Sequence, residues 1–311
     1  MPHKLIKIGT RGSALALAQA REVLTKLAQA ADMAPTDLQI VEIVTSGDRI
    51  QDRPLAEAGG KGLFTKEIEH ALYDKTIDIA VHSMKDLETT MPEGLKLSAV
   101  LQREDVRDAF ISQKYTSLAK MPPSAIVGTS SLRRRAQLKY MRPDLEVVEF
   151  RGNVQTRLRK LDDGIADATF LACAGLRRLG RRDLLNAPID TEQILPAVAQ
   201  GAIALQIREN DTAIDTLSSR LNHYESALCT RAERAFLAAL NGSCRTPIAG
   251  LASIEGAFIH FRGQVLRPDG SECHSIAHTG PIDDAERIGL DAATALLKQS
   301  GPDILDCSKR T

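Results

Sequence analysis

The stretch IAVHSMKD, residues 79–86, decides how the sequence is expected to fold. Its first four residues are typical of the end of a buried strand, and its last four are polar or flexible and end in a cation and a carboxylate. In an open α/β sheet, reactive groups lie just beyond the carboxyl ends of the strands. Asp86 is therefore a candidate working carboxylate, and the alternative is that it only caps the segment that follows.

The composition is that of an ordinary soluble globular protein. The chain has 311 residues, of which 43% are hydrophobic and 26% charged, enough for two or three domains with a large core. Lys+Arg and Asp+Glu both number 40, so the net charge attracts neither nucleic acid nor a membrane. Any anion site must come from local clustering of basic residues.

Cysteine usage and the apolar runs indicate the compartment. The five cysteines are widely spaced and form no C-x-x-C pair, which argues against a disulfide framework or a zinc site and for a reducing compartment. The N-terminal segment has no signal-peptide apolar run, and no apolar run reaches the ~20 residues of a membrane helix. We predict a cytoplasmic protein that binds no metal and no membrane.

Strand and helix patterns alternate on both sides of the opening stretch. We expect strands at 5–10, 38–45 and 77–82, helices at 14–30 and 63–73, and a glycine-bearing loop at 46–62. This β-α-β-α-β order predicts a parallel sheet with right-handed crossovers. A long loop in a compact domain is typically a lid or a disordered connection.

Further along the chain the same patterns predict two more domains. Strands are expected at 95–101, 109–112, 125–128, 147–150 and 168–173, and the chain crosses between domains at 101–105 and 196–206. A helix at 224–240, strands at 248–254, 257–265 and 273–278 and a helix at 283–299 predict a small α+β domain. The predicted domains are 1–102 with 199–220, then 103–198, then 221–311.

Basic residues recur where a strand gives way to a helix, and they lie at positions 11, 133–134, 151 and 177–178. A helix N-terminus offers free N–H groups, and a guanidinium binds carboxylates bidentately. This recurrence predicts a cleft for a ligand with many negative charges.

The stretch GTSSLRRR, residues 128–135, combines hydroxyl groups with three arginines at a helix start. Successive helix residues point ~100° apart, so the three arginines cannot all reach one ligand, and a solvated side chain is the alternative for Arg135. On the next helix, Arg157 is expected at the edge of the buried stripe and Arg159 on the solvated side. Cys244 follows a helix stop, and a single cysteine in such a place is more often a small buried thiol than a reactive one.

Together these segments resemble the porphobilinogen deaminase (hydroxymethylbilane synthase) family. The matching segments follow the family's order and cover nearly the whole chain: TRGS at 10–13, GGKGLF at 59–64, residues 78–86, RED and RDAF at 103–110, residues 127–134, RGNV at 151–154, AGL at 174–176, QGA at 200–202 and GSC at 242–244. Each segment alone is a weak signal, whereas together they are specific.

The resemblance implies a three-domain α/β fold. Its first two domains would resemble type II periplasmic binding proteins around a hinged cleft, and the small third domain would carry the cofactor. It also implies a dipyrromethane cofactor joined to Cys244 by a thioether, four porphobilinogens joined head to tail with loss of ammonia, and release of hydroxymethylbilane by water. The implied protein is a monomer that binds no nucleic acid.

The resemblance also assigns roles to individual residues. Asp86 would stabilise positive charge at pyrrole nitrogens and assist proton transfer. The carboxylates of cofactor and substrate would contact a set of basic and hydroxyl residues, together with neighbours from the matching motifs: Arg11, Ser13, Lys61, Ser83, Lys85, Thr129, Ser130, Ser131, Arg133, Arg134, Arg151, Arg157, Arg178 and Gln200. Lys61 would belong to a mobile loop.

Three positions depart from the family pattern. The family usually has a proline within two residues after Asp86, whereas this sequence has Leu87 and Glu88. Ala199 replaces a usual glycine, and Gln206 replaces a common glutamate. The first two concern the local backbone, and no departure removes a charged or covalent group from the expected site.

Two other functions compete with this interpretation. A non-enzymatic anion or solute receptor on the same bilobed fold would be favoured by a secretion signal, and it leaves Cys244 and the third domain unexplained. A nucleic-acid binder using residues 131–135 is disfavoured by the zero net charge and the 4% aromatic content.

Overall fold

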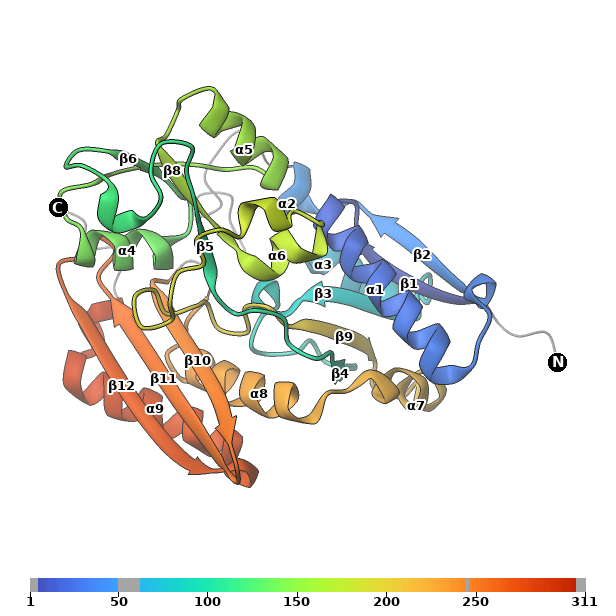
Figure 1. The fold of residues 1–311 in the computed structure, drawn as a ribbon. Helices are drawn as coiled ribbons and strands as arrows, with labels where there is room; N and C mark the ends of the chain where they lie inside the picture. The colour runs from blue at the N-terminus through green and yellow to red at the C-terminus, as the bar shows by residue number, and fades with distance from the viewer. Residues whose placement is uncertain (1–4, 50–61, 244–245, 306–311) are drawn as a thin grey trace. The chain divides into compact units, whose positions relative to one another are not determined.

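The computed structural model describes residues 5–49, 62–243 and 246–305 (Figure 1). The chain divides into two compact units, the first formed by residues 1–104 and 201–227 and the second by 105–200 and 228–311. The strands that the structure describes form three sheets, accompanied by helices, which confirms the α/β class. Two of the boundaries between units, at 104/105 and 200/201, fall inside the predicted crossings, while the three domain ranges stay a prediction.

The first unit is built on a mixed sheet with the strand order β2-β1-β3-β9-β4. β1 (Ile6–Arg11) pairs in parallel with β2 (Leu38–Ile43) and β3 (Ile79–Ser83). β9 (Ile203–Arg208) runs antiparallel to both β3 and β4 (Leu95–Val100). The three strands expected within residues 5–82 pair in parallel, which confirms that prediction. β9 adds an antiparallel strand that was not predicted, because it arrives from a distant part of the chain rather than through a crossover helix.

Helices cover both faces of this sheet. α1 (Ala14–Ala31) packs Val23 and Leu27 against one face, where they join a core with Ile79. α3 (Lys66–Tyr73) packs Ile68 against the other face, in a core that contains Ala80. Successive residues of β3 thus enter opposite cores, as the pleat of a strand requires. α7 (Thr212–Ser218) contributes Ile214 to the first core.

The expected loop at 46–62 and helix at 63–73 need correction. Residues 46–49 form a short helix, α2 (Ser46–Arg49), and α3 begins at Lys66 because residues 62–65 form a turn. Gly47 lies against the Phe64 ring, where a Cβ would come within 2.2 Å of a ring carbon. Residues 50–61 lie outside the described residues.

The second unit contains a sheet with the order β5-β8-β6-β7. β8 (Ala168–Ala172) pairs antiparallel with β5 (Asp108–Ile111) and parallel with β6 (Ile126–Gly128), which pairs with β7 (Glu146–Val148). Phe170 and Leu171 of β8 enter cores on opposite faces. The helices are α4 (Leu132–Met141), α5 (Val154–Asp162) and α6 (Cys173–Arg178).

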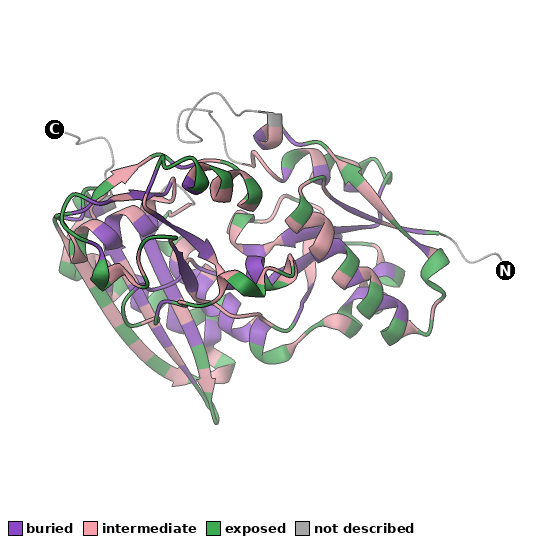
Figure 2. Cartoon of the chain, turned by 45° about the horizontal axis from the view of Figure 1, so that its top comes forward, coloured by how far each residue is buried: buried purple, intermediate pink, exposed green. Residues whose placement is uncertain are grey.

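The second unit also holds an antiparallel sheet of β10 (Ile248–Glu255), β11 (Phe258–Leu266) and β12 (Cys273–Pro281). Phe236 of α8 (Tyr224–Ala239) packs on Phe261 with ring centroids 4.8 Å apart. Six buried side chains of α9 (Ala285–Ser300) complete this core, and the buried residues are purple in Figure 2. Short 3₁₀ turns lie at Pro35–Asp37, Met84–Asp86, Leu118–Lys120, Arg182–Leu184, Ser219–Leu221, Ile282–Asp284 and Pro302–Leu305.

Ala199 adopts the left-handed backbone that glycine usually takes, with φ 59°. Its N–H donates to Glu233 Oε2 at 2.6 Å, and Glu233 Oε1 accepts from the N–H of Ala252 at 2.8 Å. Glu233 is fully buried. A left-handed L-residue costs about 1–2 kcal/mol, and this carboxylate fixes the backbone in that conformation.

Within the described parts of the chain, every helix is too short or too polar to traverse a lipid bilayer.

Candidate active site

Asp86 ends a 3₁₀ turn, Met84–Asp86, that follows β3 directly. Its side chain is exposed, and among the described residues it forms no hydrogen bond or ion pair. It therefore caps no neighbouring segment, and the alternative interpretation from the sequence is wrong. The structure presents an unpaired carboxylate at the carboxyl end of a central strand, where chemistry is expected in an open sheet.

The backbone beneath Asp86 is fixed by three contacts. The N–H of Met84 donates to the carbonyl of Ala202 at 3.0 Å. Ser83 Oγ lies 2.9 Å from Nε2 and 3.0 Å from Oε1 of Gln19. His82 Nε2 lies 3.0 Å from Gln206 Oε1. Ser83, expected at the ligand, thus also positions the turn, and half-buried Lys85 lies within it.

Arg11 lies at the end of β1, and its guanidinium is already paired. Its Nε donates to Asp48 Oδ2 at 3.2 Å, a second nitrogen pairs with Oδ1, and the group stacks 4.1 Å from the Phe64 ring centroid. Burial would raise the pKa of Asp48, but hydrogen bonds from Arg11 and Thr45 lower it overall. Asp48 was not predicted as a site residue, because it lies in the segment expected to be a loop.

Hydroxyl groups at the two predicted anion sites serve as local caps. Ser13 Oγ accepts from the N–H of Ala16 at 3.3 Å and begins α1. Thr129 Oγ1 accepts from Ser131 at 3.2 Å, and Ser130 Oγ accepts from Phe150 at 3.0 Å. Ser131 caps α4. In each case the oxygen accepts, so the O–H remains able to donate to a carboxylate.

Arg133 and Arg134 converge on one buried carboxylate, Asp108. Arg133 donates to Asp108 Oδ2 at 2.7 Å and to the Leu195 carbonyl at 2.7 Å. Arg134 donates to both oxygens of Asp108, at 3.1 and 2.6 Å, and to the Phe170 carbonyl at 2.9 Å. Each of the three nitrogens of Arg134 thus donates a hydrogen bond. Arg133 Nε, in contrast, is buried and has no hydrogen-bond partner among the described residues.

Gln200 belongs to the same cluster. Its Nε2 donates to Asp108 Oδ1 at 2.9 Å and to the Val106 carbonyl at 2.7 Å. Burial alone would raise the pKa of Asp108, but the two guanidiniums lower it far below the ordinary value. Asp108 lies in the RDAF segment that resembles the family, but no role was predicted for it. An acidic residue directly before an apolar strand was the available signal.

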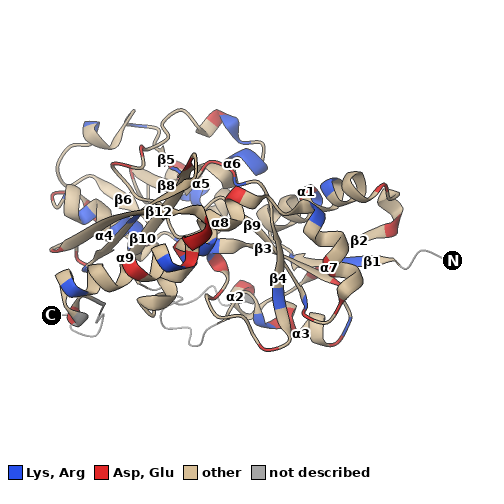
Figure 3. Cartoon of the chain, turned by 90° about the horizontal axis from the view of Figure 1, so that it is seen from below, with Lys and Arg blue, Asp and Glu red and all other residues tan. Residues whose placement is uncertain are grey.

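Positive charge is concentrated around Arg157, as the lowered pKa of its side chain indicates. Its pKa is lowered to about 10 by burial and by the charges of Arg134 and Arg151. Its Nε donates to the Gly152 carbonyl at 2.9 Å. The structure thus brings residues 134, 151 and 157 together, and one carboxylate, Asp108, balances part of their charge. Figure 3 shows the basic residues of the chain in blue.

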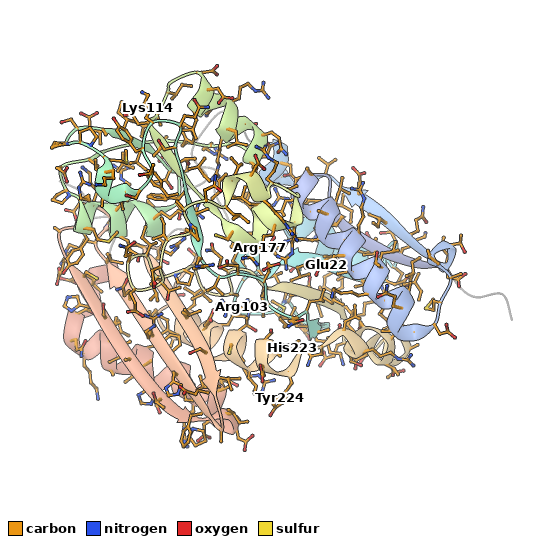
Figure 4. The ribbon with its side chains drawn as sticks, viewed as in Figure 1. Glu22, Arg103, Lys114, Arg177, His223 and Tyr224 are labelled. Atoms are coloured by element: carbon orange, nitrogen blue, oxygen red, sulfur yellow. The ribbon has the colours of Figure 1, made fainter. Side chains whose placement is uncertain are left out.

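The remaining arginines differ in their surroundings. Arg159 is exposed, as expected from the helical pattern. Arg177 donates to Asp105 at 3.0 Å and is labelled in Figure 4. Arg178, the predicted ligand contact, is half-buried at the end of α6.

Lys61 and Cys244 lie outside the described residues. Among the cysteines that the structure describes, Cys173 and Cys229 are buried and Cys273 is half-buried. Burial raises the pKa of Cys173 to about 11 and also raises that of Cys273. Because the thiolate is the nucleophile, neither of these two thiols is activated for covalent attachment.

Comparison with known proteins gives matches along nearly the whole chain. Residues 6–216 match the family described as "Porphobilinogen deaminase, dipyromethane cofactor binding domain", and residues 227–298 match "Porphobilinogen deaminase, C-terminal domain". A porphobilinogen deaminase of Paracoccus denitrificans is 53% identical over 307 residues, covering 99% of this chain and 98% of that protein. One of Nitrobacter hamburgensis is 53% identical over 297 residues, covering 96% and 94%.

Solved structures give more distant matches. The periplasmic VFT2 domain of BvgS from Bordetella pertussis is 14% identical with a TM-score of 0.42, covering 70% of this chain and 87% of that domain. A putative methionine-binding lipoprotein of Bacillus subtilis is 13% identical with a TM-score of 0.42, covering 72% and 92%. Likeness at this level decides neither fold nor function, and the fold class rests on the sheets described above.

We expect Asp108→Asn to destabilise the protein by about 3–5 kcal/mol at pH 7, because it leaves two buried guanidiniums facing an amide. The pKa of Asp108 is depressed, so its contribution is complete above the ordinary value of 3.8 and is lost as the pH falls below it. The difference in unfolding free energy between wild type and variant should therefore shrink below pH 4. Urea titrations at several pH values measure it, and a difference that stays constant to pH 2.5 would contradict the depressed pKa.

Proposed function

The chain belongs to the porphobilinogen deaminase family, and from this membership we propose that it condenses four porphobilinogens head to tail, releasing four ammonia molecules, and with one water yields hydroxymethylbilane. The observation that carries the proposal is the exposed, unpaired carboxylate of Asp86, at the end of a central strand in a chain matched over nearly its full length. Family membership favours this enzyme over the solute receptor.

Asp86 acts where positive charge develops on the substrate. When the aminomethyl C–N bond of porphobilinogen breaks, ammonia leaves and the pyrrole nitrogen becomes positive. A new C–C bond then forms to a free pyrrole carbon, and that carbon loses its proton. A carboxylate aimed at the ring N–H stabilises the cation formed when ammonia leaves and the cation formed with the new C–C bond. It can also take up the proton that the carbon loses. The contacts beneath residues 82–84 keep Asp86 in place without neutralising it.

The cofactor of this chain is dipyrromethane, attached through Cys244. When bound, it supplies the free pyrrole carbon from which the product grows. The charge around α4 fits such a group: burial lowers the pKa of Arg157, and the nearby positive charges of Arg134 and Arg151 lower it further. Two carboxylates per pyrrole match this excess of positive charge.

The basic and hydroxyl residues divide the work of binding carboxylates. Arg151, Arg157 and Arg178 contact carboxylates directly, together with the O–H groups of residues at the starts of α1 and α4: Ser13, Thr129, Ser130 and Ser131. Arg11, Arg133 and Arg134 contribute charge while paired to Asp48 or Asp108. Contacts to the ligand are proposed for the remaining residues as well: Lys61, Ser83, Lys85 and Gln200. The protein works as a cytoplasmic monomer.

Removing the charge of Asp86 tests the proposal. We expect Asp86→Asn to lower turnover of porphobilinogen at least ~100-fold, because an amide cannot stabilise the developing cations. Product formation and ammonia release are the readouts. Asp74→Asn, which removes the same charge from an exposed position of the same unit, should leave turnover within about twofold. Full turnover by Asp86→Asn would refute the mechanism.

Arg157 and Arg159 form a matched pair on α5. Losing a charge-assisted hydrogen bond of ~1.5–3 kcal/mol should make Arg157→Gln raise the KM for porphobilinogen about 10- to 100-fold. Arg159→Gln removes the same charge two residues away, where the side chain is exposed, and should change KM less than about twofold. Steady-state kinetics compares them. Equal effects of the two variants would mean that general charge, rather than a contact, binds the substrate.

A further inference from the structure

His82 is a buried titratable residue that the proposed reaction does not use directly. It is 5% exposed and lies on β3, four residues before Asp86. In the register of β3 with β9, Ala80 lies opposite Gln206 and His82 lies opposite Ala204. His82 and Gln206 are therefore diagonal neighbours on one face of the sheet. That face carries Ala80, which packs in the core beneath α3.

The contacts of Gln206 determine the tautomer of His82. Gln206 is fully buried, its Nε2 donates to Glu69 Oε1 at 3.2 Å, and its Oε1 lies 3.0 Å from His82 Nε2. An ionised carboxylate only accepts hydrogen bonds, so the amide nitrogen must face Glu69. The amide oxygen must then face His82, and an oxygen requires a donor. His82 is consequently the Nε2–H tautomer.

We propose that His82 is a positioning residue for Asp86, held as the neutral Nε2–H imidazole through Gln206 and Glu69. This inference rests on the proposed function, in which Asp86 needs a fixed place without a partner of its own. The ring hydrogen bond ties the last buried residue of β3 to β9. The Ser83–Gln19 contact and the Met84–Ala202 backbone bond extend the same anchor into the turn that carries Asp86.

Burial and a nearby positive charge keep His82 neutral. Its pKa is lowered to about 4, first by burial and also by the positive charge of Arg11 on β1, against the hydrogen bond of Gln206. Arg11 is itself paired with Asp48. On α3, burial raises the pKa of Glu69, the charge of Glu88 adds to this, and Gln206 and His70 oppose it. The pKa of the Tyr73 phenol is raised by burial and then by the charges of Glu69 and Glu93.

Gln206→Glu tests the tautomer directly. A carboxylate at this position stabilises the imidazolium and repels Glu69, so the pKa of His82 should rise into the range pH 5–9. The ion pair between the His82 imidazolium and the carboxylate at position 206 is present at low pH and is lost as the pH rises through that pKa. We therefore expect the kcat of the variant, relative to wild type, to fall about tenfold as the pH rises, with a single inflection at the pKa of His82. A tenfold change corresponds to an interaction that shifts a pKa by about one unit. Gln39→Glu adds the same charge at an exposed site of the same unit and should show no such inflection.

Nitrogen-15 NMR of histidine-labelled protein reads His82 without an activity assay. In the wild type we expect the neutral Nε2–H pattern between pH 5.5 and 8, and in Gln206→Glu the pattern of an imidazolium that titrates. Wild-type His82 in the Nδ1–H form, or titrating above pH 6, overturns the inference. So does a Gln206→Glu variant with an unchanged pH profile of kcat.

Two substitutions of His82 provide a second test if Gln206→Glu does not fold. The amide nitrogen of glutamine lies near the place of Nε2, and that of asparagine lies near Nδ1. His82→Gln should therefore keep at least about tenfold more kcat than His82→Asn, with little change in KM. Equal loss in both variants overturns the inference. If Asp86→Asn is inactive while these variants behave alike, the positioning role fails and the proposed function stands; if Asp86→Asn is fully active, the proposed function itself fails.

Discussion

The contact between Asp108 and the two guanidiniums of Arg133 and Arg134 is the constraint on which the second unit depends. A carboxylate that is 1% exposed receives hydrogen bonds from both arginines and from Gln200, and the arginines continue to the carbonyls of Leu195 and Phe170. Burying three charges is unfavourable unless each is closely paired, so such a cluster fixes geometry more than it adds stability. The first turn of α4 therefore has one position, and its capping hydroxyls and the charge near Arg157 follow from it.

In the first unit the carboxylate of interest is exposed rather than buried. Here the proposed catalytic carboxylate, Asp86, is exposed and has no partner among the described residues. Rigidity comes from neutral groups beneath it: an imidazole, two amides and a serine hydroxyl. A paired Asp86 would have its charge neutralised before a substrate arrived. Fixed groups that face developing charge without reorganising are the main source of electrostatic catalysis. In the proposed function, the second unit contributes paired charges to ligand binding and the first unit contributes the carboxylate that acts in the reaction.

The sequence was sufficient for features that depend on local patterns. The buried strand end at residues 79–82, the Ser13 cap of α1 and the exposure of Arg159 follow from periodicity and capping chemistry, and the structure confirms them. It was insufficient for contacts between distant residues. Asp108 meets arginines 25 and 26 residues away, and Gln206 meets His82 across 124 residues. The antiparallel direction of β9 was missed for the same reason, because it depends on the path of the whole chain between residues 104 and 201.

The chain is proposed to build a polypyrrole on a cofactor of its own, attached at Cys244. The most direct test of this claim is the intact mass of the purified protein under denaturing conditions, measured beside Cys244→Ser. We predict that the wild type is heavier than its sequence by one dipyrrole and that the variant has its bare sequence mass, even after incubation with porphobilinogen. A wild type that keeps its bare mass after the same incubation, or a variant that carries the same added mass, would contradict the claim.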